Sequence, residues 1–328
     1  MPDDRPTLAL AHSADPDDVF MWWPLTGIVG VEGGVGVNGG AGDGVGPAID
    51  TGRFVYRSVP GDIAAFNRLA SGPAPHDITA LSVRAYADVA DRYVLTSCGA
   101  SFGLGYGPKV VARVGGPGAH DLHRPDVRIA IPGRETSAFL TLALCLGLRG
   151  DAGPRGASPA HPRFVETPFD AIIPAVVEGR VDAGLVIHEG QVLFERAGLR
   201  QAIDLGQWWG ETRGLPLPLG VNAVKRDLDA RFGPGTIAHV AERLRASLAH
   251  ALAHRDESLR ACVPFARVNA LRSGIPEPDL ATIDRYVAMY VNRYTQDMAG
   301  EGRAAIARLL AEGADAGLCP RTNPIDVV

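Results

Sequence analysis

Cysteine is scarce in this sequence, and no two cysteines lie close together. The four are Cys98, Cys145, Cys262 and Cys319. Because no CxxC pair is present, their spacing fits neither a zinc site nor a disulfide framework. We therefore expect free thiols and a reducing compartment.

An excess of basic residues and a long apolar run are also missing. The chain has 32 Lys and Arg against 37 Asp and Glu, which gives a net charge of −5. This balance attracts neither nucleic acid nor an anionic membrane surface, so we expect neither as a partner. No stretch of about 18 apolar residues predicts a membrane span. The N-terminal sequence MPDDRPTLALAHS has acidic residues and no apolar run of signal-peptide length, so we expect a cytoplasmic protein.

Several chemical motifs are absent as well. The sequence contains no GxxxxGK[ST] phosphate loop, no GxSxG nucleophile elbow and no HExxH zinc motif. The glycines at 103–107 do not follow a strand and open a helix, so they do not predict a dinucleotide site. The pairs His120/His123 and His250/His254 are spaced to chelate a metal, but neither pair has an obvious third ligand. We expect surface histidines and no metal.

The 46% of hydrophobic residues is enough for a sizeable core, and the length suggests about two domains. Strand-like and helix-like segments alternate along the chain, which predicts an α/β protein with mainly parallel sheets. The strand-like segments are residues 7–13, 77–83, 127–133 and 181–189, and the helix-like segments are residues 15–25, 84–93, 136–147 and 168–179.

The C-terminal part of the sequence has helical spacing. Apolar residues three and four apart predict helices at 237–252, 280–294 and 301–313, which we expect to pack around one of the domains. Two Gly-rich stretches, residues 27–52 and 149–163, predict loops. The first lacks the motifs of a phosphate loop and of a calcium-binding GGxGxD repeat. We therefore expect a flexible loop or loose hairpin that is dispensable for chemistry.

Polar residues follow four of the strand-like segments. Residues 12–18, Ser82, residues 132–137 and residues 188–190 stand where those strands end. In open α/β sheets the loops after the strands meet at one edge, where ligands bind. The sequence therefore predicts a site built from these four segments.

Two of these segments also begin helices, and two interpretations stay open for each. Thr136 and Ser137 are typical helix caps, and the same helix start would offer free N–H groups to a carboxylate. Asp17 and Asp18 would stabilise a helix N-terminus. Alternatively they would form hydrogen bonds with ligand hydroxyl groups, for which Asp18 is the candidate.

A histidine closes the strand-like segment 181–189. A core histidine bonded to a backbone carbonyl is the ordinary interpretation of such a residue. His188, however, stands at the mouth of a strand beside Glu189, where the other polar loops are expected to meet. Imidazole is well suited to abstract a proton near neutral pH, so His188 is a candidate general base.

Several longer stretches of the sequence together form a specific combination, an SxDPxD start with GRxT, HE and LGxWW…GLPLPLG. The stretches are HSADPDDVFMWWPL (12–25), ALSVRAYADVADRYV (80–94), GLGYGPKVVAR (103–113), IAIPGRETSAFL (129–140), VVEGRVDAGLVIHEG (176–190), DLGQWWGETRGLPLPLG (204–220) and YVNRYTQDMAGEGRAAIARLLAE (290–312). With this combination the chain resembles a known family, the 1,4-dihydroxy-6-naphthoate synthases of the futalosine route to menaquinone.

The resemblance implies a periplasmic-binding-protein-like (type II) fold, with two α/β lobes and a ligand cleft between them. Crossover strands near 107–113 and 218–225 would divide the chain. Lobe one would comprise residues 1–113 and 218–328, with the C-terminal helices, and lobe two residues 114–217.

The resemblance also implies an activity and a set of site residues. The family converts cyclic dehypoxanthine futalosine, a small-molecule carboxylate, into 1,4-dihydroxy-6-naphthoate. The histidine of its HE motif, thought to be the base, falls on His188. The substrate-contacting positions fall on Ala80, Leu81, Ser82, Ser137 and Ala138, beside the helix start at Thr136. This chain has Ala80 where some relatives have lysine, which removes one possible carboxylate partner.

Three functions remain as hypotheses. The first is a carbon–carbon lyase that uses His188 to remove a carbon-bound proton; it needs no metal or organic cofactor. The second is a non-catalytic ligand-binding protein, because the same fold serves solute capture. The third is chorismate dehydratase, a sister enzyme of the pathway, but the DPDD start and the HE motif favour the lyase.

Overall fold

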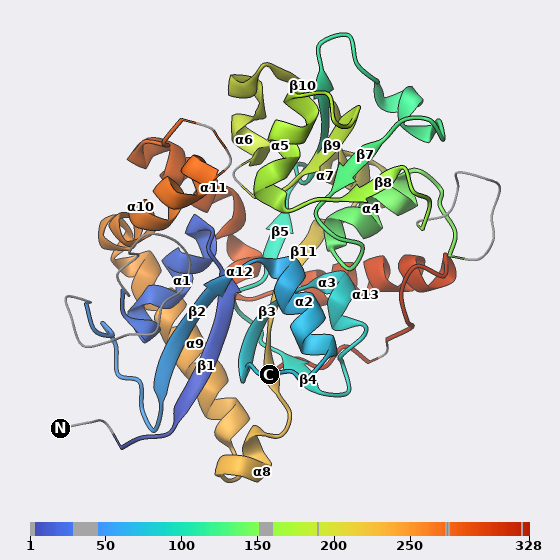
Figure 1. The fold of residues 1–328 in the computed structure, drawn as a ribbon. Helices are drawn as coiled ribbons and strands as arrows, with labels where there is room; N and C mark the ends of the chain where they lie inside the picture. Colours follow the sequence, from blue (N-terminus) through green and yellow to red (C-terminus); the bar gives the residue numbers. More distant parts are fainter. Residues whose placement is uncertain are drawn as a thin grey trace.

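The computed structural model describes residues 4–28, 45–150, 160–188, 190–272, 274, 276–322 and 324–328. Within this part of the chain the strands form two separate sheets, and helices pack around both (Figure 1). The alternation of strands and helices confirms the predicted α/β class. No helix in the described ranges has both the length and the apolar character that crossing a bilayer requires.

The first sheet has the strand order β2-β1-β3-β11-β4, and β5 pairs with β11. Strand β1 runs parallel to β2 and β3, whereas β11 runs antiparallel to β3, β4 and β5. The strands are β1 (Thr7–Ser13), β2 (Val55–Gly61), β3 (Ile78–Ser82), β4 (Tyr93–Leu95), β5 (Ser101–Gly103) and β11 (Leu217–Lys225).

The second sheet has the order β10-β6-β9-β7-β8. Strand β7 is parallel to β8 and β9, and β6 is antiparallel to β9 and β10. The strands are β6 (Lys109–Arg113), β7 (Ile129–Ile131), β8 (Phe164–Glu166), β9 (Ala183–Val186) and β10 (Leu199–Asp204).

Helices from the N-terminal part and from the C-terminal part of the chain cover the first sheet. The N-terminal helix α1 packs against the long C-terminal helices α9, α10 and α11 (Figure 1). The helices are α1 (Pro16–Thr26), α2 (Ile63–Ser71), α3 (Val83–Tyr86), α4 (Ser137–Cys145), α5 (Phe169–Val177), α6 (Gly190–Leu193), α7 (Leu205–Arg213), α8 (Leu228–Phe232), α9 (Thr236–Ala253), α10 (Arg255–Arg272), α11 (Leu280–Tyr290), α12 (Arg293–Gln296) and α13 (Ala299–Asp315), with 3-10 turns at Ala119–His123 and Phe194–Ala197.

The C-terminal helices form where the apolar spacing predicts them. In α9, Val240, Leu244 and Leu248 are buried in the core beneath the first sheet, and Ile237 and Leu252 pack against that core. Three and four residues separate these side chains, so they form one stripe along the helix. Helix α13 also contacts α4, which follows β7 of the second sheet, so the packing of the whole tail around one domain stays a prediction.

The prediction of mainly parallel sheets is wrong for the strands next to the crossings between the sheets. Strands β1, β3, β7 and β9 end at the edge where the two sheets face each other. Strands β6 and β11 begin at this edge, because the chain has just crossed from the other sheet before each of them. They therefore run in the opposite direction to their neighbours β9 and β3.

The strand pairing also bears on the predicted lobe boundaries. The expected first lobe, 1–113, includes β6, but β6 pairs with β9 and β10 in the second sheet. The first crossing therefore lies between Gly103 and Lys109, and the second precedes Leu217. We propose that the second lobe begins at Lys109, a few residues earlier than the sequence indicated.

Two predicted helices are shorter in the structure, and one helix was not predicted. The segment 280–294 is helical as α11 only to Tyr290, and the short α12 begins at Arg293. The segment 84–93 is helical only to Tyr86, because the next amides bond three residues back, from Ala87 to Arg84 and from Asp88 to Ala85. Tyr93 already begins β4. Helix α10 was not predicted, and it contains a proline, Pro264, in its interior.

The two Gly-rich stretches fall mainly outside the described residues, at 29–44 and 151–159. The residues that flank the first, Ile28 and Val45, form an antiparallel bridge. The expectation that residues 27–52 are dispensable for chemistry stays a prediction.

Close backbone contact joins α7 to the first crossing segment. A Cβ added at Gly206 would lie 2.0 Å from the carbonyl oxygen of Tyr106, whereas one at Gly210 would meet nothing closer than 4.0 Å. We expect Gly206→Ala to lower the free energy of unfolding by about 1–3 kcal/mol, because the backbones must separate. Gly210→Ala in the same helix should raise it by about 0.5–1 kcal/mol. Urea unfolding of both variants checks this, and equal effects would contradict it.

Candidate active site

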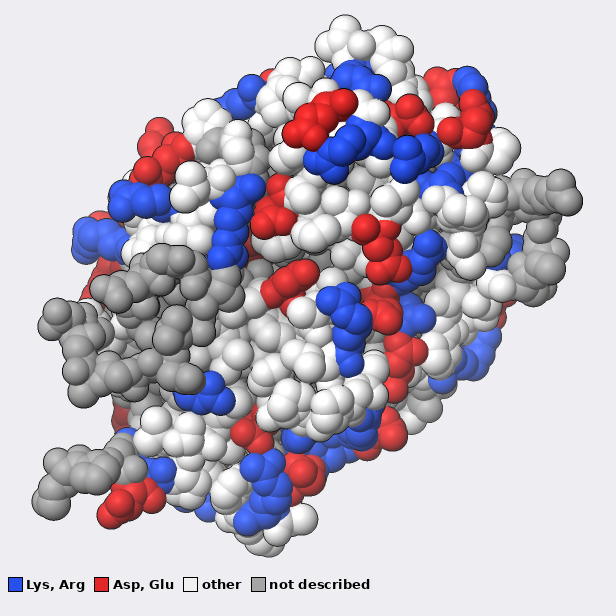
Figure 2. Space-filling model, viewed as in Figure 1, with Lys and Arg blue, Asp and Glu red and all other residues white. Residues whose placement is uncertain are grey.

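A cavity with an empty volume of about 800 Å³ lies where the two sheets face each other. The loops after four strands meet in it: Ser13 follows β1, Ser82 ends β3, Pro132 follows β7 and His188 follows β9. These are the four segments whose polar residues predicted a site. On the face shown in Figure 2, acidic and basic side chains of the described residues are interspersed.

Helix α1 places three carboxyl groups at the cavity. Asp15 is its N-cap, Pro16 occupies the first helical position, and Asp17 and Asp18 lie in its first turn. Proline fits the first helical position because no N–H is needed there. The positive end of the helix favours acidic residues at these positions. All three aspartates are at least nine-tenths buried, with exposed fractions of 2%, 7% and 7%.

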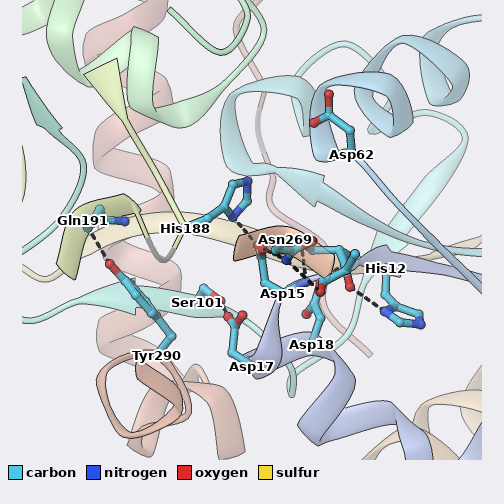
Figure 3. Close-up of polar contacts among 12 residues, drawn as sticks. His12, Asp15, Asp17, Asp18, Asp62, Ser101, His188, Gln191, Asn269 and Tyr290 are labelled. Atoms are coloured by element: carbon cyan, nitrogen blue, oxygen red, sulfur yellow. Dashed lines mark hydrogen bonds and ion pairs between the residues drawn. The ribbon is translucent and has the colours of Figure 1, made fainter. Parts of the chain in front are cut away.

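The side chain of Asp15 belongs to a hydrogen-bond network and makes no capping hydrogen bond to helix α1. Ser13 Oγ donates to Asp15 Oδ2 at 2.5 Å, and Asn269 Nδ2 lies 3.5 Å from Asp15 Oδ1. Asp15 Oδ2 also pairs with His188 Nδ1, and the imidazole and the carboxyl group face each other in Figure 3. The network fixes the orientation of the carboxyl group against the imidazole.

His188 is held by its backbone, its ring and its carboxylate partner. Its φ of 56° lies in the left-handed region, which histidine and asparagine enter more readily than most residues. The ring contacts Phe169 edge to face, with centroids 4.7 Å apart. When Nδ1 donates to Asp15, the lone pair of the neutral imidazole lies on Nε2. The neighbouring Glu189 lies outside the described residues.

Asp17 and Asp18 differ from Asp15 in their surroundings. Burial, together with the charge of Asp15, raises the pKa of Asp17 to about 7. Burial and the charge of Asp17 raise the pKa of Asp18 well above its usual value. The backbone N–H of Ser13 donates to Asp18 Oδ2 at 2.7 Å, and Ser101 Oγ lies 3.4 Å from Asp17 Oδ2.

His12 lies near these residues, but its ring is buried and forms hydrogen bonds within the protein. Its ring nitrogens contact the Ser13 carbonyl oxygen and Ser58 Oγ, both at 2.7 Å. Burial lowers its pKa to about 4, so the ring is neutral at pH 7. His12 is not among the residues that line the cavity. Of the two strand-end histidines, only His188 reaches it.

The start of α4 supplies backbone donors on the side of the cavity that the second sheet forms. Thr136 Oγ1 caps the helix by accepting from Phe139 N at 3.1 Å, so its predicted capping role is confirmed. Ser137 Oγ donates to the Leu219 carbonyl at 2.6 Å. The side-chain hydroxyls are therefore engaged within the protein. The N–H groups of Ser137 and Ala138, which no carbonyl one turn earlier can satisfy, are the donors of this helix start.

Strand β3 supplies the facing wall. Ala80, Leu81 and Ser82 are buried on this strand and line the cavity. Asn67 fixes its end, because Asn67 Oδ1 accepts from Ser82 N and Asn67 Nδ2 donates to Ser82 Oγ, both at 3.0 Å. Every residue expected to contact substrate thus lies on one cavity: Asp18, Ala80, Leu81, Ser82, Thr136, Ser137 and Ala138.

The charges around the cavity have one sign. Among its described lining residues there is no lysine or arginine; those with ionisable acid or imidazole groups are Asp15, Asp17, Asp18, Asp62 and His188, with the phenols Tyr286 and Tyr290. A carboxylate ligand would therefore be bound by backbone N–H groups rather than by a side-chain cation. It would also be repelled by the charge of Asp15 at the start of α1.

The other histidine pairs do not join this site. His250 and His254 stack with their ring centroids 4.0 Å apart, and His120 and His123 lie on the 3-10 turn Ala119–His123. Across the described ranges, no three His, Cys, Asp or Glu side chains are grouped to hold a metal ion.

Several site residues escaped the sequence analysis. Tyr290 OH donates to Gln191 Oε1 at 2.8 Å, and burial raises the pKa of Tyr290 well above its usual value. Asn269 comes from α10 and Asn222 from the middle of β11. None of these stands in a strand-end loop, so no local pattern marks them. Only folding brings Tyr290, Gln191 and Asn222 to the cavity and Asn269 to Asp15.

Solved structures of other proteins share this architecture. A protein from Archaeoglobus fulgidus is 35% identical, with a TM-score of 0.72 over 95% of this chain and 98% of that chain. The alkanesulfonate-binding protein SsuA from Xanthomonas axonopodis is 15% identical, with a TM-score of 0.62 over 99% of each chain. The second likeness concerns the fold alone, and it confirms the expected periplasmic-binding-protein-like fold.

Sequence comparisons give the family. The model described as "Menaquinone biosynthesis" matches residues 8–315. A 1,4-dihydroxy-6-naphthoate synthase of Thermus thermophilus is 40% identical over 269 residues, which cover 81% of this chain and 86% of that protein. The enzyme of the same name from Streptomyces coelicolor is 31% identical over 84% of this chain and 97% of its own length. The resemblance seen in the sequence is therefore confirmed, and the chain belongs to the menaquinone-biosynthesis family.

Proposed function

We propose that the protein is a 1,4-dihydroxy-6-naphthoate synthase, a carbon–carbon lyase that converts cyclic dehypoxanthine futalosine into 1,4-dihydroxy-6-naphthoate. The names of its two relatives and its family support this activity. The observation that carries the mechanism is the pairing of His188 with the buried carboxylate of Asp15 in the cavity between the sheets.

In this mechanism His188 is the general base. Nε2 accepts a carbon-bound proton of the substrate, and the electron pair of the broken C–H bond forms a new carbon–carbon double bond in the ring. The carbon–carbon bond to the departing fragment breaks, and this fragment leaves with the electron pair of that bond and takes up a proton. Aromatisation of the second ring provides the driving force. Asp15 is a positioning residue: it holds the proton on Nδ1 and stabilises the imidazolium that forms. The proton taken up by the base later leaves to product or solvent.

The carboxylate of the substrate would bind at the start of α4. The N–H groups of Ser137 and Ala138 point out of the first helical turn, and the helix dipole favours an anion there. Ser82, at the end of β3, lies on the same cavity. Repulsion by the charge of Asp15 would keep the carboxylate at this end.

The assay that tests the function is direct conversion. Purified protein incubated with cyclic dehypoxanthine futalosine should release 1,4-dihydroxy-6-naphthoate, with no loss of rate in EDTA, because an imidazole base needs no metal. Chorismate is the control compound. Turnover of chorismate alone would identify the sister dehydratase activity, and binding of the futalosine derivative without turnover would identify a solute-binding protein.

A cytoplasmic location also belongs to this proposal. The four cysteines, Cys98, Cys145, Cys262 and Cys319, are free in the structure. A biosynthetic role in the family and unpaired thiols both support a reducing compartment.

A further inference from the structure

We propose that Asp17 and Asn222, with Ser101 beside them, form a subsite that binds alcohol groups of the substrate through hydrogen bonds donated by those groups. This "hydroxyl subsite" rests on the proposed function and names the part of the substrate that faces α1. This subsite is separate from the proposed carboxylate site, which lies at the start of α4.

Two oxygen atoms of the subsite have no hydrogen-bond partner. Asp17 Oδ1 and Asn222 Oδ1 are both unbonded among the described residues. Their side chains are 7% and 2% exposed, and both residues line the cavity. A buried acceptor without a donor lowers stability, so few native groups remain in this state. Because both oxygen atoms are almost fully covered, a ligand that brings donors would satisfy them after a small shift of the neighbouring side chains.

The protein fixes both acceptors in place. Asn222 Nδ2 donates to the Gly99 carbonyl at 2.8 Å, which leaves the amide oxygen as the unused atom. A Cβ on Gly99 would lie 2.7 Å from this Nδ2 and 2.7 Å from the Trp22 ring, so the contact requires glycine. Gly99 also has a φ of +82°, which glycine adopts without strain.

Asp17 is oriented from the other side. Ser101 Oγ lies 3.4 Å from Asp17 Oδ2, and in Figure 3 the carboxyl group of Asp17 points toward Ser101. This contact engages one carboxyl oxygen and leaves Oδ1. Asp17 comes from the first turn of α1 and Asn222 from the middle of β11, so two separate elements build the subsite.

The chemistry of the subsite selects its ligand. Both unpaired atoms accept hydrogen bonds when Asp17 is ionised, and a second carboxylate has no proton to donate to them. Alcohol groups donate one hydrogen bond each and carry no charge, so they enter a buried site at low desolvation cost. A carboxylate held at Ser137 and alcohol groups held at Asp17 would give the substrate one orientation in the cavity, beside His188.

The raised pKa of Asp17 makes protein stability a second measurement, which separates a substrate-binding role of Asp17 from a structural role. Burial, with the charge of Asp15, raises its pKa to about 7. Since this folded-state pKa lies above the usual one, the ionised group destabilises the fold, increasingly as the pH rises toward 7 and fully above it. The titratable groups that face Asp17 are Asp15, Asp18, His188, Tyr290 and Cys262.

The experiment compares the wild type with Asp17→Asn and Ser101→Ala, using cyclic dehypoxanthine futalosine as substrate. For Asp17→Asn we expect kcat/KM to fall by about 10–100-fold, mainly through KM, because a charge-assisted hydrogen bond is lost. Ser101→Ala should lower kcat/KM less, through looser positioning of the carboxyl group. At pH 8 the melting temperature of Asp17→Asn should equal or exceed that of the wild type.

Two results would overturn the hydroxyl subsite. One is a kcat/KM for Asp17→Asn within about threefold of the wild type. The other is a fall in melting temperature at pH 8 with an unchanged KM, which would make Asp17 a structural residue. A wild type that does not convert the compound would instead refute the proposed function, and with it the substrate of this subsite.

Discussion

His188→Asn is expected to lower kcat by at least about 10²-fold and by up to about 10⁴-fold, the usual contribution of general-base catalysis. Asparagine keeps approximate size and a hydrogen bond to Asp15 but has no basic nitrogen. It also tolerates the left-handed backbone of this position, where φ is 56°. We therefore expect normal folding and a KM close to that of the wild type, because the interaction lost belongs to the transition state.

Measuring kcat and the melting temperature on the same preparation separates two roles of His188. If His188 is the general base, its replacement causes a large loss of kcat at an unchanged melting temperature. A histidine that only fills the core gives a lower melting temperature and near-normal turnover per folded molecule. The second outcome would remove His188 from the mechanism.

Asp15→Asn should have the second largest effect, a loss of kcat of at least about 10²-fold, comparable with changes in other carboxylate–imidazole pairs. The neutral amide can present its NH₂ group to Nδ1, which would move the imidazole proton to Nε2 and abolish the base. It also removes the charge that stabilises the imidazolium. Substrate does not contact Asp15 in the proposed mechanism, so KM should change little.

Asp62→Asn is the matched control. Asp62 also lines the cavity, but its side chain caps α2 by accepting from Ala64 N at 2.9 Å, which asparagine can do equally well. We expect its kcat to stay within about threefold of the wild type, since neutral changes of this kind cost little. Equal losses in both variants would mean that the total negative charge matters, and not the Asp15–His188 pair.

Much of the site follows from the order of strands and loops in the sequence. The segments after β1, β3, β7 and β9 carry the polar residues, and parallel strands bring their carboxyl ends together. This explains why a buried strand ends in an imidazole: β9 delivers His188 to the edge where the two sheets meet. The helix cap at Thr136 follows from local preferences as well.

Other parts could not be predicted because they depend on contacts between distant segments. Asn269 reaches Asp15 from 254 positions along the chain, and Asn67 reaches Ser82 across α2 and β3. Strands β6 and β11 are antiparallel to their neighbours because the chain crosses from one sheet to the other just before each strand. The amino-acid composition does not reveal where these crossings occur. The partner of His188 is another example: Asp15 was seen only as part of a polar segment, since nothing in the sequence relates the two positions.

The absence of lysine and arginine from the described wall of the cavity has a consequence for selectivity in a crowded cell. Backbone N–H groups at a helix end can hold an anion, but the charge of Asp15 in the same cavity, with no cationic side chain beside it, would oppose the second negative charge of a phosphate ester. Sugar phosphates and nucleotides would therefore compete poorly for this cavity. With no cationic side chain to be shielded, substrate affinity should also vary little with ionic strength.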